Sequence, residues 1–327
     1  MSGASGSQRL VAGGVAAASW LACHLPGDMV ERLFDLLGAA HYRFNPRRRE
    51  LVRANLGRVC AALVADGHAT PKVAAAAADP RALERLVRAA FRHHGRYLSE
   101  LLRIPVMDQA WLRRHFAVDD PMLVEEAFGR VDDGQPMIVI GLHFGAVEVP
   151  AVYSAGRLST DVVGPMEAVS NPALQAWIVA QRERLGLHVI APPEAAPAEL
   201  RRVLEAGGVV GIVADRDITG GGRATELFGA PLPLPVGPAL LAVGSGARTY
   251  VVGARRIGWG RYRGRLVELP LPSEGSLRER VERVLATEAR AFEAIIAESP
   301  EQWWAVMFPL WPDLAGAATT PAATVTA

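Results

Sequence analysis

The sequence predicts an α/β protein with a mixed central β-sheet, flanked by helices and preceded by a helical N-terminal region. Two short apolar runs rich in β-branched residues, 136–143 and 208–215, are each followed by glycine and polar residues, which is typical of buried strands. Helical patterns lie between these runs, and amphipathic helical patterns precede them. This alternation indicates a sheet that is covered by helices.

Composition limits the classes of function. The chain has 327 residues, 50% of them hydrophobic; length alone would suggest two domains, but we expect one. The net charge is +1, so no field of the whole molecule favours nucleic acid as a partner. Cys23 and Cys60 lie in apolar stretches without a metal ligand at nearby spacing, and we expect neither a disulfide nor a metal site.

The N-terminal segment is apolar but short. Residues 10–23 carry no charge, yet a helix that spans a membrane needs about 20 apolar residues. A buried helix and a helix lying in a membrane interface both fit this segment. We interpret residues 1–27 as a membrane-associating segment, 28–313 as the folded domain, and the small, polar stretch 314–327 as a disordered tail.

The remaining elements follow from periodicity. Apolar residues at intervals of three and four predict helices over 28–42, 46–64 and 80–102, with prolines at the start of the last two. Residues 73–78 fit a connector or a short helix, and helices are also predicted over 172–185, 196–206, 238–243 and 276–298. Residues 247–257 and 262–270 predict a pair of strands, which makes the sheet mixed.

The stretch GLHFGAVEVP offers the clearest chemistry. His143 ends the first predicted strand, Gly145 opens a turn, and Glu148 follows five residues after the histidine. In α/β sheets functional groups gather where strands end and helices begin. Histidine can take a proton from an alcohol while a carboxylate on its other ring nitrogen fixes the tautomer. From these residues alone, a histidine–glutamate base pair and a structural core histidine both remain open.

Several segments together resemble a known family. In chain order they are YRFNPRRRELVRANLGRV, HFGAVE, NPALQAWIVAQRERLGLHVI, GGVVGIVADRDITGGG, ELFGAPLPLPVGPALLAVGSGA and SPEQWW. They resemble the bacterial lipid A biosynthesis (late) acyltransferase family, which includes the phosphatidylinositol mannoside acyltransferases of actinobacteria, and they span residues 42–304. The resemblance implies a glycerolipid-acyltransferase-like fold and identifies His143 and Glu148 as the ends of its HxxxxE motif.

The resemblance also implies residue roles. His143, paired with Glu148, would deprotonate an acceptor hydroxyl as it attacks the thioester of acyl-CoA or acyl carrier protein, without a cofactor. Arg182 matches the site arginine of the family and would contact phosphate; read alone, it fits a solvated helix face. Asp215 stands where the mannoside acyltransferases carry glutamate, and because its side chain is shorter we expect no direct bond to His143. Arg216, beside the 220–222 glycine run, is a supporting or substrate-binding candidate.

The implied acceptor is a glycolipid. The sequence ADRD and an arginine-rich composition favour a mannosylated phosphatidylinositol, while a lipid A precursor or another glycolipid or lysophospholipid stays open. We expect peripheral or monotopic attachment to the cytoplasmic face of the cell membrane, with Arg47, Arg48, Arg49 and Arg53 available to anionic headgroups. The aromatic residues 303, 304, 308 and 311 fit either headgroup depth or core packing, and the proline-rich stretch 226–238 fits an ordered loop beside an acyl channel.

Two readings from other classes remain. Asp215-Arg216-Asp217 could be the Asp-x-Asp of a metal-dependent glycosyltransferase, whose activity would need a divalent ion. Alternatively the chain is a non-enzymatic peripheral membrane scaffold that uses its basic N-terminal helices. In that case replacing His143 would change nothing.

Overall fold

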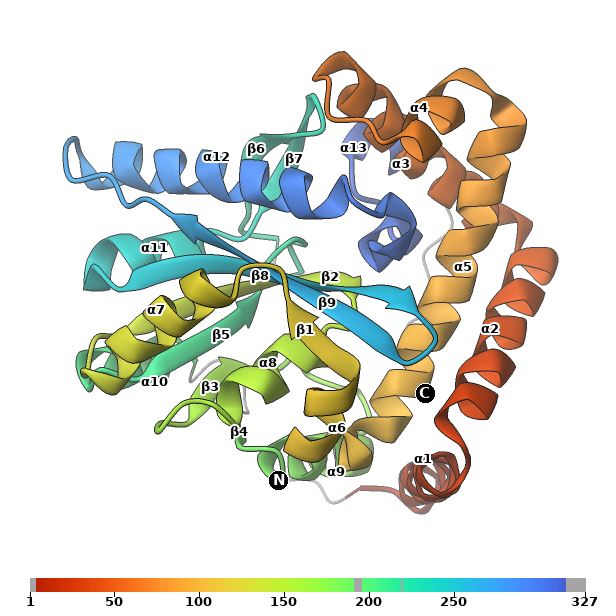
Figure 1. Ribbon diagram of the computed structural model, residues 1–327, viewed down its shortest axis with the longest axis horizontal. Helices are drawn as coiled ribbons and strands as arrows, with labels where there is room; N and C mark the ends of the chain where they lie inside the picture. The colour runs from red at the N-terminus through yellow and green to blue at the C-terminus, as the bar shows by residue number, and fades with distance from the viewer. Residues whose placement is uncertain (1–3, 191–195, 219, 316–327) are drawn as a thin grey trace.

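The computed structural model describes residues 4–190, 196–218 and 220–315, and it is an α/β fold built on a seven-stranded sheet (Figure 1). The strand order is β1-β9-β8-β2-β5-β3-β4. Neighbouring strands are parallel except β8 and β9, which form an antiparallel pair. The predicted mixed sheet is therefore confirmed. The strands are β1 (Phe116–Val118), β2 (Met137–Gly145), β3 (Val162–Pro165), β4 (Leu187–Ile190), β5 (Val209–Val213), β8 (Arg248–Gly258) and β9 (Arg261–Leu269).

The N-terminal region is helical, as predicted, and α2 and α5 run along one side of the molecule (Figure 1). The helices here are α1 (Gly6–His24), α2 (Gly27–Phe44), α3 (Pro46–Ala65), α4 (Pro71–Ala78) and α5 (Pro80–Arg103). Local chemistry sets the starts of α3 and α5. Each has proline in its first turn and a side-chain cap, from Asn45 and Asp79 respectively, that accepts hydrogen bonds from backbone N–H groups. Residues 73–78 belong to a short helix rather than a connector.

Helices cover both faces of the sheet because β2 alternates its apolar side chains. Ile138, Ile140 and Leu142 belong to a core shared with one set of helices, whereas Met137 and Val139 belong to a second core with another set. The first set includes α10 (Ala196–Glu205), α11 (Gly237–Ser245) and α12 (Leu277–Ile296); the second includes α6 (Gln109–His115), α7 (Pro121–Asp132) and α8 (Glu148–Ala155). Helix α9 (Pro172–Glu183) packs against α1 and β4.

The proline-rich stretch is a hairpin and not a loop. Strands β6 (Arg223–Leu227) and β7 (Ala230–Leu234) pair antiparallel, and Pro231 and Pro233 lie within β7. A strand in a two-stranded sheet has one unpaired edge, so prolines at alternate positions there remove no ladder hydrogen bond. Phe228 and Gly229 form the turn with φ angles of 51° and 69°, as a tight hairpin with a type I′ turn requires.

The chain after Trp311 begins with structure that the sequence did not suggest. Leu314 belongs to the short helix α13 (Pro312–Ala315) and packs against the main core, so the expected tail does not begin at residue 314. Residues 316–327 of the expected tail lie outside the described residues. In the part of the chain that is described, no helix combines the length and the apolar character needed to cross a membrane.

Candidate active site

The site forms where two neighbouring parallel strands end. Strands β2 and β5 pair in register from Met137 opposite Val209 to Gly141 opposite Val213. Two residues further along each chain come His143, near the end of β2, and Asp215, just past β5. Parallel strands bring their carboxyl ends to one edge of a sheet, and the register therefore brings these two side chains together.

Asp215 is a direct partner of His143. Its Oδ1 lies 2.6 Å from His143 Nδ1, and its Oδ2 accepts hydrogen bonds from the backbone N–H of His143 at 3.0 Å and from Trp303 Nε1 at 2.6 Å. The expectation that the shorter aspartate would not reach His143 is wrong, because the strand register already brings the two residues into contact. With Nδ1 engaged, Nε2 is the ring nitrogen left for a substrate.

The Asp215 carboxylate is held in its charged form. It is fully buried, which by itself raises its pKa, but the charge of His143 and the hydrogen bonds from His143 and Trp303 outweigh burial and leave the pKa below its usual value. A buried anion thus faces the imidazole. It favours the tautomer that carries the proton on Nδ1.

Glu148 has a different partner from the one the motif spacing suggested. It lies in the first turn of α8, and its Oε1 is 2.5 Å from Arg182 Nη2 on α9. Burial lowers the pKa of Arg182, but the adjacent Glu148 carboxylate raises it more, and the guanidinium stays charged. The structure therefore joins Glu148 to Arg182, while Asp215 occupies Nδ1 of His143.

Aromatic residues line the site beside the imidazole. The Trp304 ring meets the His143 ring edge to face, with centroids 4.3 Å apart, and Tyr97 on α5 stacks on Trp304 at 4.7 Å. Burial and the nearby Glu148 raise the pKa of Tyr97, so its hydroxyl is neutral. The sequence indicated no role for Tyr97, and it placed Trp304 only among the C-terminal aromatic residues that fit headgroup depth or core packing.

The other C-terminal aromatics belong to the core. Trp303 and Trp311 are each 0% exposed, so headgroup depth is the wrong interpretation for both. Trp303 also forms a β-bridge with Phe144, which fixes its indole N–H against Asp215. The segment after α12 thus positions Asp215, the partner of His143, through Trp303. The short 3-10 turns here are η3 (Pro300–Gln302) and η4 (Trp304–Met307).

Gly145 allows the turn that follows the histidine. Its φ is +56°, and a Cβ atom built on it would lie 1.9 Å from the carbonyl oxygen of Ala254 on β8. Only glycine fits such a backbone and such an approach. The carbonyl of Gly145 accepts a hydrogen bond from Arg256 Nη2 at 2.9 Å, and Arg256 is itself paired with buried Glu100 on α5.

The Asp215-Arg216-Asp217 sequence does not present two carboxylates to one ligand. Asp215 faces His143 and Trp303, while Asp217 accepts hydrogen bonds from the backbone N–H groups of Gly220 and Gly222 at 3.0 and 2.8 Å. Within the described residues, histidine, cysteine, aspartate and glutamate form no group of three that could hold a metal ion. The geometry gives the glycosyltransferase reading no support.

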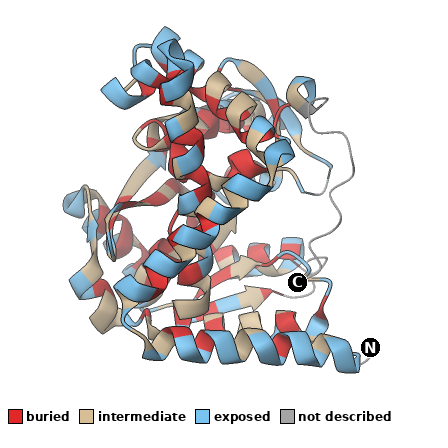
Figure 2. Ribbon diagram, turned by 90° about the vertical axis from the view of Figure 1, so that its right-hand side faces the viewer, coloured by how far each residue is buried: buried red, intermediate tan, exposed pale blue. Residues whose placement is uncertain are grey.

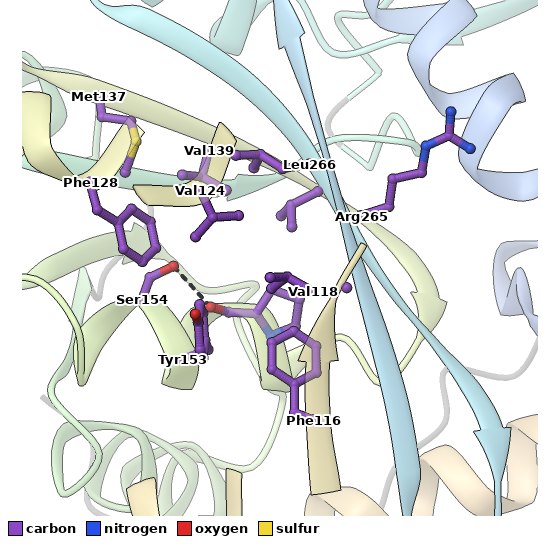
Figure 3. Close-up of a pocket in the computed structure, with 13 residues that line it drawn as sticks. Phe116, Val118, Val124, Phe128, Met137, Val139, Tyr153, Ser154, Arg265 and Leu266 are labelled. Carbon is purple, nitrogen blue, oxygen red and sulfur yellow. Dashed lines mark hydrogen bonds between the residues drawn. The ribbon is translucent and has the colours of Figure 1, made fainter. Parts of the chain in front are cut away.

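A separate apolar pocket lies between the sheet and helices α7 and α8 (Figure 3). Val139, Phe128 and Tyr153 line it, and none of the five site residues expected from the sequence does. Arg265 points away from this pocket (Figure 3) and pairs with Glu298 instead. The pocket is therefore distinct from the imidazole site.

With this geometry established, comparison with known proteins decides the family. Residues 10–311 match the model of the bacterial lipid A biosynthesis acyltransferase family. The chain belongs to this family. It is 30% identical over 242 residues to the phosphatidylinositol mannoside acyltransferase of Mycobacterium tuberculosis (strain CDC 1551 / Oshkosh). The aligned residues cover 71% of this chain and 68% of the relative. It is 28% identical over 244 residues to the protein of that name from Mycolicibacterium smegmatis, with 72% of each chain covered.

Membership of the bacterial lipid A biosynthesis acyltransferase family makes the chain an O-acyltransferase. The resemblance seen in the sequence motifs is confirmed. It also means that the scaffold reading, which had no enzymatic role for His143, loses its basis.

Proposed function

We propose that this acyltransferase moves a fatty acyl group from acyl-CoA or acyl carrier protein to a hydroxyl of a glycolipid, such as a phosphatidylinositol mannoside. The observation that carries the proposal is the buried Asp215 carboxylate bound to His143 Nδ1, which leaves Nε2 as a base. The names of the relatives support the acceptor class. No cofactor takes part in the proposed reaction.

His143 acts as the general base in the proposed reaction. Its Nε2 takes the proton from the acceptor hydroxyl while the oxygen attacks the thioester carbonyl, and Asp215 stabilises the imidazolium that forms. The C–O bond forms, the C–S bond breaks, and the departing thiolate takes the proton back from Nε2. Asp215 positions the imidazole and does not touch substrate.

Glu148 and Arg182 serve substrate binding in this proposal. Arg182 lies on α9 with its side chain largely buried and held by Glu148. A charged, oriented guanidinium suits a phosphate group of the donor or the acceptor. Glu148 therefore fixes the arginine and is not the direct partner of the base.

The first experiment is transfer of radiolabelled palmitate from palmitoyl-CoA to a total polar-lipid extract in EDTA. We expect His143→Ala to lower the rate by about 10²–10⁴-fold, the usual contribution of a general base. Glu148→Ala should also lower it. The matched control is His188→Ala, because His188 is an exposed histidine on β4. If wild type transfers nothing from palmitoyl-CoA or from palmitoyl acyl carrier protein, or if His143→Ala keeps the wild-type rate, the proposal is wrong.

Peripheral membrane association is the second part of the proposal, and α2 carries the observation. Met29, Leu33, Leu36, Leu37 and Phe44 recur along the helix at intervals that keep them on one side, and their exposed fractions run from 47% to 80%. Figure 2 shows the ribbon of this helical region from outside, coloured by burial. A row of large apolar side chains in water is costly, whereas a lipid interface would bury it. Exposed apolar residues of α1, namely Leu10, Trp20 and Leu21, extend this character.

Sedimentation with vesicles that contain anionic lipid tests this part. We expect Leu36→Ser with Phe44→Ser to reduce the bound fraction severalfold, because both side chains are largely exposed on α2 and their loss removes apolar surface that a lipid interface would bury. Leu277→Ser is the control, since Leu277 is 53% exposed at the start of α12. Equal binding by the double variant and wild type would rule out the α2 face.

A further inference from the structure

Two arginines from distant segments contact the ring of Phe308, which neighbours the Trp304 ring beside the proposed base. The Cζ atom of Arg216 lies 3.9 Å from the centroid of the Phe308 ring, and that of Arg48, in the first turn of α3, lies 5.8 Å from it. The Phe308 ring lies 6.3 Å from that of Trp304, which contacts His143. Two aromatic rings, Phe308 and Trp304, therefore connect the arginine pair with the imidazole.

The chain holds this arrangement in place. Asn55, which is 0% exposed, donates hydrogen bonds from Nδ2 to the carbonyl oxygens of Val306 and Phe308, each at 2.9 Å. Arg48 itself donates to the carbonyl of Met307. Helix α3 thus fixes the segment that carries the ring, and Arg216, which directly follows buried Asp215, lies against that ring.

The charge of the two arginines is poorly compensated. Within the described residues no carboxylate forms an ion pair with Arg48, and the ion pair of Arg216 is a long one of 4.0 Å to the exposed Glu167. Arg58 provides the contrast, because it lies over the Trp311 ring at 5.1 Å and has Asp313 as a close ionic partner. The stacking of Arg58 is similar, but its charge is neutralised.

Two neighbouring histidines have lowered pKa values, mainly because they are buried. Burial and Arg48 lower the pKa of His41. Burial, His41, Arg48 and Arg256 together lower the pKa of His94 to about 4. Both histidines therefore stay neutral at neutral pH, first because burial disfavours the charged ring and second because Arg48 lies nearby.

We infer that Arg48 and Arg216, held against Phe308, form a binding site for a phosphate group of a substrate. Guanidinium groups bind phosphate oxygens through pairs of hydrogen bonds, and a bound phosphate anion would supply negative charge. The inference rests on the proposed acyl transfer, which needs a substrate near His143. The phosphate belongs either to the coenzyme A part of the donor or to the phosphodiester of a glycolipid acceptor.

Calorimetric binding of two probes separates these sources without turnover. The probes are coenzyme A and glycerophosphoinositol, titrated into wild type, Arg48→Gln, Arg216→Gln and the double variant. Arg58→Gln is the matched control, because it removes a stacked arginine whose charge is already paired. A cooperative thermal unfolding transition verifies that each variant is folded. If the double variant is not folded, the two single variants provide the comparison with wild type.

We expect the double variant to bind one probe at least tenfold more weakly, with smaller losses in the single variants and none in Arg58→Gln. A loss confined to coenzyme A assigns the site to the donor, and a loss confined to glycerophosphoinositol assigns it to the acceptor. If both affinities stay within twofold of wild type, the inference is wrong. This binding readout is independent of the His143→Ala transfer assay, so the two proposals fail separately.

Discussion

At the residue scale, one buried carboxylate determines the state of the proposed base. Asp215 accepts hydrogen bonds from two nitrogens of His143 and from the indole of Trp303, and it has no exposure to solvent. Each of these donors requires an acceptor. An amide in place of the carboxylate would put an NH₂ group toward at least one donor and would remove the charge that stabilises the imidazolium.

Asp215→Asn should therefore lower kcat by about 10²–10⁴-fold, the range for loss of general-base catalysis. Asp215→Glu should retain more activity, because it keeps the charge. Trp303→Phe serves as a partial control that removes only one hydrogen bond to the same carboxylate. Steady-state kinetics of the three variants would contradict the assignment if Asp215→Asn had the kcat of wild type.

A second buried carboxyl, Glu288 on α12, should affect stability rather than catalysis. It is 0% exposed, and neither oxygen has a hydrogen-bond partner among the described residues. Burial and the charge of Asp215 raise the pKa of Glu288 well above its usual value. The folded protein therefore binds a proton that the unfolded chain releases, and stability falls as the pH rises through and above the ordinary glutamate range.

Glu288→Gln removes this pH dependence. We expect the advantage of the variant over wild type in unfolding free energy to grow by up to about 1.4 kcal/mol for each pH unit above the ordinary glutamate range, because only wild type must keep a proton on the buried carboxyl. Urea denaturation at several pH values measures the gain. Glu274→Gln, at an exposed position, is the control. A difference that shrinks as the pH rises would contradict the sign of the pKa shift.

At the element scale, the passage from β2 to α8 decides where the imidazole points. The backbone turns at Gly145 and passes within contact distance of Ala254 on β8. The same turn brings Glu148 to the start of α8, opposite Arg182 of α9. The HFG-x-x-E spacing thus encodes a strand, a tight turn and a helix start. It does not encode a direct histidine–glutamate bond.

Gly145→Ala should destabilise the fold by about 3 kcal/mol or more, because the added methyl group meets the Ala254 carbonyl and the positive φ disfavours alanine. Gly129→Ala is the matched control. Gly129 lies inside α7 with open space around its Cα, and the change should stabilise by up to about 1 kcal/mol. Thermal denaturation compares the two. Similar melting temperatures for wild type and Gly145→Ala would refute the steric argument.

At the scale of the whole molecule, a buried ion pair joins the N-terminal helices to the sheet. Arg256 on β8 pairs with Glu100 on α5, with side chains only 1% and 7% exposed, and Tyr262 donates a further hydrogen bond to Glu100. The side-chain amide of Gln302 accepts a hydrogen bond from the backbone N–H of Arg256 and donates one to its carbonyl oxygen. These contacts connect α5, β8, β9 and η3 directly beneath the turn at Gly145.

Removing one partner of this pair should be costly. Glu100→Gln leaves Arg256 buried without its counter-charge, and we expect a loss of about 3–5 kcal/mol in unfolding free energy. Glu125→Gln, which breaks the largely exposed pair with Arg157, should change stability by less than about 1 kcal/mol. Urea denaturation measures both. Equal losses in the two variants would show that burial does not matter here.

The sequence alone determined the fold class, the family and, to within a few residues, the bounds of the longer helices and of strands β2, β5, β8 and β9, whereas it did not predict β1, β3 and β4. Prolines with side-chain caps set the starts of α3 and α5, and β-branched runs set β2 and β5, because these signals act within a few residues along the chain. The positions of His143 and Asp215 at strand ends followed from the same patterns. In contrast, the prolines of β7 concealed a strand, because only its pairing with β6 shows that their edge is free.

Only the tertiary structure decided which side chains meet. His143 and Asp215 are 72 residues apart, and their bond depends on β2 and β5 being neighbours in register. The contact of Trp304 with His143 and the approach of Arg48 to Phe308 likewise join distant segments. Local patterns carry no information on strand order or on the helix that packs behind a strand. The partners of the base, and therefore the chemistry of the site, appear only when the chain is folded.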